Sequence, residues 1–255
     1  MENDDDDEPP VDFDSIAGFI FELLRIIQLM CEGHNQKMKS YVSKQPDNIK
    51  SINLVRARKV CTVGLTLGPR GGVAQVEKAV EYLHVVYLNI DGDSIELVQQ
   101  NLETLIEVTS GHPDNQVVVF DSKGVDIINH LLRLDNFPGC DADDVIALKR
   151  STVLLAETLL EENSAFSARL AKDVRGSHGL LGADADALLA QLYAVLDLEA
   201  VRRIMFDERY MPSAATEGED DPAEIGFLCY RVLLRFRDFN VRSARPGGGR
   251  ERVVR

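Results

Sequence analysis

The amino-acid sequence predicts an all-α fold on three observations. Apolar residues recur every three or four positions along most of the chain, which is the spacing that gives a helix one apolar face. Pairs containing glycine or proline interrupt this pattern at short intervals, as expected of loops between helices. Strand signals are thin, because the β-rich run at 117–120 is short and has no alternating partner nearby. A buried turn leading into the next helix fits that run as well as a strand does.

Taken in order, the periodic stretches define the expected helices. The first runs from Ile16 to Met30, the second from Val73 to Ile90 and the third from Ile95 to Leu105. Further stretches cover about 123–134, 142–161, 184–205 and 223–239. We therefore expect residues 13–241 to form roughly eight to ten helices, joined by short loops.

Many of these helices carry apolar residues on more than one side. Leu23-Leu24, Ile26-Ile27 and Leu131-Leu132 are examples. A helix between two neighbours needs two apolar sides, and a stacked helical solenoid supplies that arrangement. A compact bundle satisfies the same pattern, and no strict internal repeat separates the two. Of these, the armadillo-like helical solenoid is the preferred prediction.

Charge divides the chain into a body and two tails. The 255 residues hold 42 acidic and 28 basic side chains, and the net charge of −14 disfavours nucleic acid as a partner. Six of the acids lie in the first eight residues, within a predicted disordered tail at 1–12, and an arginine-rich disordered tail is predicted at 242–255. An acidic, solvated loop is expected at about 213–222.

The sequence predicts no membrane-spanning segment and no disulfide framework. The longest apolar stretch, at 16–30, is interrupted by Glu22, Arg25 and Gln28, which rules out a spanning helix. The four cysteines are far apart and form no paired motif, so we expect buried, reduced thiols.

Two loops resemble ligand-binding motifs but have the wrong residues at the decisive positions. The glycine-rich loop at 68–72 lacks the Gly-Lys-Ser/Thr ending of a phosphate loop and is predicted to connect two helices. Alternating polar residues at 89–93 resemble an EF-hand, but Ser94 and Gln100 stand where that loop needs glycine and glutamate. Asp93 or Ser94 is expected instead to cap the following helix. The histidines show no zinc-ligand spacing and no nucleophile elbow occurs, so the chain is not expected to be an enzyme.

Three blocks resemble one known family. The run LLRIIQLMCEGHN at 23–35 resembles the opening signature of the ryanodine and inositol-trisphosphate receptor homology-associated (RIH-associated) domain. LETLIE at 102–107 resembles a second block of that family, and SKGVDII at 122–128 resembles a third from the inositol-trisphosphate receptor branch. The resemblance covers about 15–175 and is closer to this branch than to ryanodine receptors.

This resemblance implies a cytosolic, armadillo-type module of a tetrameric intracellular calcium-release channel. Such a module passes ligand-induced motion to the pore, so the expected partners are other domains or subunits of the channel. The expected location is the cytosolic face of the endoplasmic reticulum membrane. The alternative is a cytoplasmic, free-standing helical scaffold without channel activity.

The resemblance also implies calcium ligands. The glutamates of the first two blocks fall on Glu32 and Glu107, with His34 beside the first. Calcium takes about six to eight oxygen ligands, so two carboxylates form only part of a regulatory site. A further ligand comes from another region of the channel in the family, and Ser110 and His112 depart from the family pattern. We therefore expect calcium binding to be weak or absent in the isolated chain.

Overall fold

The computed structural model describes residues 13–33, 35–43, 75–161, 185–210 and 223–243, and every regular element among them is helical. The prediction of an all-α fold is therefore confirmed. The predicted loops at 68–72 and 213–222 lie outside the described residues, as do the predicted tails apart from residues 242 and 243. The elements are α1 (Phe13–Cys31), α2 (Gln36–Ser43), α3 (Gln75–Val86), α4 (Ile95–Thr109), α5 (Pro113–Asp121), α6 (Gly124–Arg133), α7 (Ala142–Leu159), α9 (Ala185–Val195), α10 (Leu198–Met205), the short 3-10 helix η1 (Glu208–Tyr210) and α11 (Ala223–Ser243).

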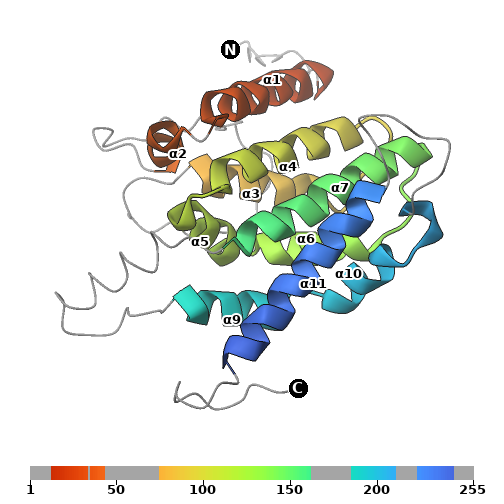
Figure 1. The fold of residues 1–255 in the computed structure, drawn as a ribbon. Coiled ribbons are helices and arrows are strands. Elements are labelled where there is room, and N and C mark those ends of the chain that lie inside the picture. The colour runs from red at the N-terminus through yellow and green to blue at the C-terminus, as the bar shows by residue number, and fades with distance from the viewer. Residues whose placement is uncertain (1–12, 34, 44–74, 162–184, 211–222, 244–255) are drawn as a thin grey trace, which may run out of the picture.

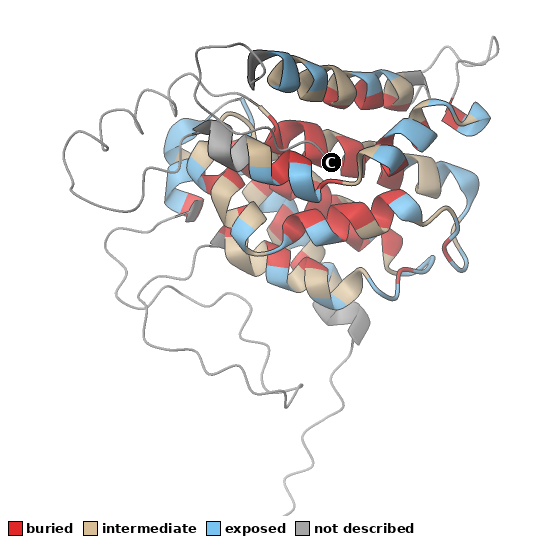
Figure 2. Ribbon diagram, turned by 90° about the horizontal axis from the view of Figure 1, so that it is seen from below, coloured by how far each residue is buried: buried red, intermediate tan, exposed pale blue. Residues whose placement is uncertain are grey.

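The helices lie in stacked layers (Figure 1). α1 packs on α4, α4 packs on α7, and α7 packs on α11. The main cluster of buried apolar side chains extends from α3 through α4, α6 and α7 to α10 and α11. A small separate cluster of Ile20, Leu24 and Leu97 joins α1 to α4. Buried residues concentrate in the middle of the stack and exposed ones on its outer faces (Figure 2). The armadillo-like solenoid stays a prediction.

The β-rich run at 117–120 belongs to α5, so it forms neither a strand nor a turn. The start of this helix explains why. Pro113 occupies the first turn, where its missing N–H costs nothing, and His112 is the N-cap. The His112 Nδ1 accepts a hydrogen bond from the Asn115 N–H at 3.3 Å. These start signals prevail over the β propensity of the valines that follow.

The apolar-periodic stretch at 184–205 is divided into α9 and α10. Asp197 lies at the break and is the N-cap of α10, since its carboxylate accepts from the Ala200 N–H at 3.0 Å. The Asp197 N–H donates to Asn129 Oδ1 on α6 at 2.8 Å, which anchors the break against a third helix.

The loop before α4 was predicted to supply a helix cap. Ser94 stands at the N-cap position of α4, but its side chain makes no hydrogen bond to the helix. The Ser94 hydroxyl donates instead to Asp91 Oδ1 at 2.8 Å, so the pair closes the turn rather than the helix end. In the same loop the Gly92 N–H donates to the Pro138 carbonyl at 3.0 Å. A Cβ at position 92 would lie 2.6 Å from the Gly139 carbonyl oxygen, so this contact requires glycine.

Two cysteines are buried as expected. Cys31 and Cys229 are free thiols in the core, whereas Cys140 is half-buried and Cys61 lies outside the described residues. Among the described helices, none combines the length and the apolar character that crossing a membrane requires.

Candidate functional site

The first two sequence blocks meet because α1 and α4 pack side by side. Gln28 Oε1 on α1 accepts from Gln100 Nε2 on α4 at 2.7 Å, in a buried position. The Thr104 hydroxyl on α4 donates to the Leu24 carbonyl at 3.1 Å. Buried polar groups of this kind are costly to leave unpaired, so these bonds specify how α1 is placed along α4.

Glu32 and Glu107, the two predicted calcium-binding carboxylates, lie at the end of this contact between α1 and α4. Glu107 on α4 is half-buried and lies close enough to Cys31 for its charge to act on the thiol. Burial raises the pKa of Cys31, with Lys39 opposing and Glu107 adding to the change. Glu32 directly follows Cys31 and is exposed, and its N–H donates to the Gln28 carbonyl at 3.0 Å.

The structure therefore brings Glu107 near Cys31, the residue directly before Glu32. His34 lies outside the described residues. The pairing of Glu32 with Glu107 as calcium ligands stays a prediction.

A buried lysine shares this region. Lys39 on α2 is fully buried, and its Nζ donates to the Ser110 carbonyl at 2.9 Å, at the C-terminal end of α4. Burial lowers the pKa of Lys39, and the charges of Glu107, Cys31 and Glu161 oppose that change. Lys39, Glu107, Ser110 and Glu161 are called the Lys39 junction below.

Sequence reasoning did not single out Lys39. A signal was available, because Lys39 stands three residues before the buried Val42 and therefore on the apolar side of α2.

The two positions that depart from the family pattern both contact α2, Ser110 through its backbone and His112 through its side chain. The Ser110 backbone supplies the carbonyl that Lys39 binds. His112 caps α5 through Nδ1, so its Nε2 carries the proton and lies 3.0 Å from the Ser40 hydroxyl on α2. Between them, the Gly111 N–H donates to Glu161 Oε2 at 3.0 Å, which links this loop to the end of α7.

The described side chains do not by themselves complete a calcium site. The Lys39 junction holds the Glu107 carboxylate and a Glu161 carboxylate that already accepts from the Gly111 N–H. An ammonium group lies among these acids, and calcium needs about six to eight oxygens. Over the part of the chain that the structure describes, no three His, Cys, Asp or Glu side chains are grouped for a metal ion.

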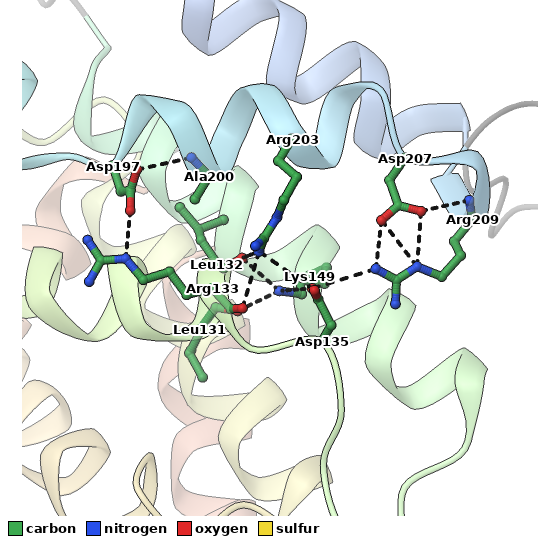
Figure 3. Close-up of polar contacts among 10 residues, drawn as sticks. All are labelled: Leu131, Leu132, Arg133, Asp135, Lys149, Asp197, Ala200, Arg203, Asp207 and Arg209. Atoms are coloured by element: carbon green, nitrogen blue, oxygen red, sulfur yellow. Dashed lines mark hydrogen bonds and ion pairs between the residues drawn. The ribbon is translucent and has the colours of Figure 1, made fainter.

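A second buried lysine, Lys149, lies on α7 (Figure 3). Lys149 Nζ donates to the carbonyls of Leu131 at 2.7 Å and Leu132 at 2.9 Å, in the last turn of α6. Asp135 Oδ1 lies 3.4 Å from the same nitrogen. Burial lowers the pKa of Lys149 to about 8, although the Asp135 charge opposes the change.

Two arginines extend this arrangement. Arg203 on α10 lies 3.7 Å from Asp135 and donates to the Leu132 carbonyl at 3.2 Å. Arg209 lies 3.6 Å from Asp135 and pairs with Asp207 at 2.6 Å. Lys149, Asp135, Arg203, Arg209 and Asp207 are called the Lys149 cluster below; it joins α6, α7 and α10, and no sequence motif indicated it.

Comparison with known proteins matches the region that contains the first block to a known family. Residues 15–63 match the family described as RyR and IP3R Homology associated. The structure describes most of this range up to residue 43.

Two receptors are similar to longer parts of the chain. The inositol 1,4,5-trisphosphate receptor-like protein A of Dictyostelium discoideum is 30% identical over 97 residues, which are 38% of this chain and 2% of that protein. The inositol 1,4,5-trisphosphate receptor itr-1 of Caenorhabditis elegans is 29% identical over 133 residues, which are 50% of this chain and 4% of that receptor. The chain thus spans only a few per cent of the length of these relatives. The resemblance read from the three blocks is confirmed: residues 15–63 match the RIH-associated family, and both relatives belong to the inositol-trisphosphate receptor branch.

Proposed function

We propose that this chain is a cytosolic regulatory and coupling module of an inositol-trisphosphate receptor-like calcium-release channel. The observation that carries the proposal is the similarity to two inositol 1,4,5-trisphosphate receptors or receptor-like proteins. The prediction that the chain is not an enzyme agrees with these relatives at the level of the family.

Buried polar contacts between successive layers support a coupling role. The Gln28–Gln100 hydrogen bond joins α1 to α4. On the opposite side of the stack, buried Glu157 on α7 pairs with Arg231 at 2.5 Å and with Arg235 at 3.2 Å, both on α11. These contacts resist sliding of one helix past another, and α4 packs directly on α7 between them. A displacement applied at α1 would therefore be carried through α4 and α7 to α11.

The proposal includes the predicted surroundings of the module. Its partners would be other domains or subunits of a tetrameric channel, on the cytosolic face of the endoplasmic reticulum membrane. Glu32 and Glu107, with His34 beside the first, would contribute only part of an activating calcium site. The remaining oxygens would come from another region of the channel.

Full-length transcript sequencing tests the proposal directly. The expected result is one message that encodes this chain together with a ligand-binding region before it and a pore with spanning helices after it. Endoplasmic reticulum vesicles that contain the encoded protein should release calcium when inositol trisphosphate is added.

The alternative function gives a different result. If every message that contains this sequence encodes neither a ligand-binding region nor a pore, the chain acts as a free-standing scaffold. A long message whose product releases no calcium under inositol trisphosphate also contradicts the proposal.

A further inference from the structure

The ammonium group of Lys39 lies near a helix-end carbonyl and two carboxylates, which a positive charge stabilises. The last carbonyls of a helix lack partners within the helix and carry its negative dipole end. Lys39 Nζ binds the Ser110 carbonyl, which is one of these groups at the end of α4, at 2.9 Å. The side chain is fully buried, so water cannot replace this contact.

The acids of the junction come from α4 and from the residues that follow α7. Glu107 is on α4, and Glu161 follows α7 and is held by the Gly111 N–H at 3.0 Å. Lys39 itself is on α2, and its own carbonyl accepts from the Asn115 side chain of α5 at 3.2 Å. The lysine is therefore fixed by its backbone as well as by its ammonium group, among elements that carry negative charge.

We propose that the Lys39 ammonium is the resident cation of this junction, in the place where the receptor resemblance predicts a calcium ion beside Glu107. The ammonium offsets part of the charge of the acids and joins α2 to the end of α4 without a metal ion. Its effect on calcium rests on the proposed function, because that resemblance is what assigns calcium to Glu107. Its role as a structural cation does not.

This role has a consequence for divalent cations. A calcium ion that approached Glu107 would meet a buried positive charge that cannot move into water without leaving the Ser110 carbonyl unpaired. The chain should therefore bind calcium poorly as long as Lys39 is present. Removing the charge while keeping a hydrogen-bond donor should raise the affinity.

The test compares two lysines of the same helix in the full 255-residue chain. Lys39→Gln removes the buried charge and keeps a donor, and Lys37→Gln makes the same change at an exposed position of α2. Calcium chloride is titrated calorimetrically into wild type and both variants, with magnesium chloride as the comparison ion. We expect calcium to bind K39Q at least about tenfold more tightly than wild type or K37Q, because a repelling charge has been removed from a buried position.

Two results would overturn the inference. One is a wild-type chain that binds calcium as tightly as K39Q. The other is a K39Q chain that stays folded and binds calcium no better than K37Q. Either result leaves the transcript test of the proposed function untouched.

A second variant covers the case in which K39Q does not fold. The resident-cation role predicts that K39Q/E107Q then recovers folding, since one uncompensated carboxylate is removed with the ammonium group. If the double variant is no more stable than K39Q, Lys39 acts through its packing alone and the inference is wrong.

Discussion

The two buried lysines both bind carbonyls at a helix end, but their surroundings differ. Lys39 and Lys149 are both fully buried, and each donates to carbonyls at the C-terminal end of a neighbouring helix. Lys149 binds two such carbonyls and has Asp135 at 3.4 Å. Lys39 binds one carbonyl, and among the described residues its acids act through space rather than through an ion pair within 4.0 Å.

The two regions differ in how completely their charges are compensated. We call the Lys149 cluster closed, because its charges compensate one another, and the Lys39 junction open. At the Lys149 cluster, Asp135 also lies close to Arg203 and Arg209, so lysine, acid and arginines compensate one another. At the Lys39 junction, Glu107 has no comparable set of arginines among the described residues. Closed networks stabilise a structure, whereas an acid with incomplete compensation can exchange its counter-ion. The comparison thus assigns a structural role to Lys149 and an electrostatic, adjustable one to Lys39.

The largest expected effect is on Lys149. Lys149→Met should lower the free energy of unfolding by about 3 kcal/mol, because two helix-end carbonyls and Asp135 lose a buried partner. Urea unfolding followed by circular dichroism measures this. Lys78→Met is the control, since Lys78 forms an exposed pair with Glu81 and should cost less than about 1 kcal/mol. A larger loss in Lys39→Met than in Lys149→Met would reverse the comparison.

The acids of the two regions give the next test. Asp135→Asn leaves three cations close together and should cost about 2 kcal/mol. Glu107→Gln keeps the shape of a half-buried side chain that forms no ion pair within 4.0 Å among the described residues, and it should cost about 1 kcal/mol or less. The same unfolding measurement compares them. Equal losses would show that the two regions are compensated to the same degree.

Sequence patterns predicted the helical body well where one face of a helix is apolar. The stripe from Ile95 to Leu105 predicted α4, and it follows directly from the burial of that face. The run at 117–120 was ambiguous because valine propensity competes with a helix start at Pro113. The break at Asp197 was missed because apolar periodicity continues across it, and Asn129 that anchors it is distant in sequence.

The candidate site was predictable only in part. The resemblance indicated Glu107, and α4 brings it to the end of α1. The lysines were missed because a pattern reading places lysine at the surface, which is where most lysines lie. Both lysines are buried because they bind carbonyls of other helices, and such long-range contacts leave no local pattern. The one local signal for Lys39 is its place on the apolar side of α2, three residues before Val42.

Lys149 should make the free energy of unfolding depend on pH. Its pKa of about 8 in the folded chain lies below the 10.5 of an ordinary lysine. Between these values the unfolded chain binds more protons, so this residue makes stability rise with pH. Between pH 8 and 9 the wild type should gain about 1 kcal/mol relative to Lys149→Met.

The measured quantity is the difference in the free energy of unfolding between wild type and Lys149→Met, because other groups make stability fall as pH rises. Burial raises the pKa of Cys229 to about 12, and burial also raises that of Tyr210 to about 12. Both groups lower stability as pH rises above 9 or 10, and the Lys149 charge itself opposes the rise of the Cys229 pKa, so the comparison is confined to pH 7.5 to 9. A difference that is flat from pH 7.5 to 9 would mean that Lys149 keeps an ordinary pKa.

The smallest effect is expected at the rim of the Lys149 cluster. Arg133 pairs with Asp197 at 2.6 Å, but its side chain is 62% exposed, so water and salt screen the pair. The pKa of Asp197 is lowered first by the Ala200 N–H, and Arg133 adds to that change. Arg133→Gln should therefore cost about 0.5 kcal/mol, and the loss should vanish in about 1 M salt.

Arg202→Gln is the matched control for this prediction. Arg202 is 64% exposed and its pair with Glu199 is longer, at 3.9 Å, so the same substitution should have almost no effect. If Arg133→Gln instead lowered stability as much as Lys149→Met, in a salt-independent way, the exposed rim would hold the cluster together. The comparison between Lys149 and Lys39 would then fail. It assumes that the buried ammonium group, rather than an exposed arginine, contributes most of the stability of each region.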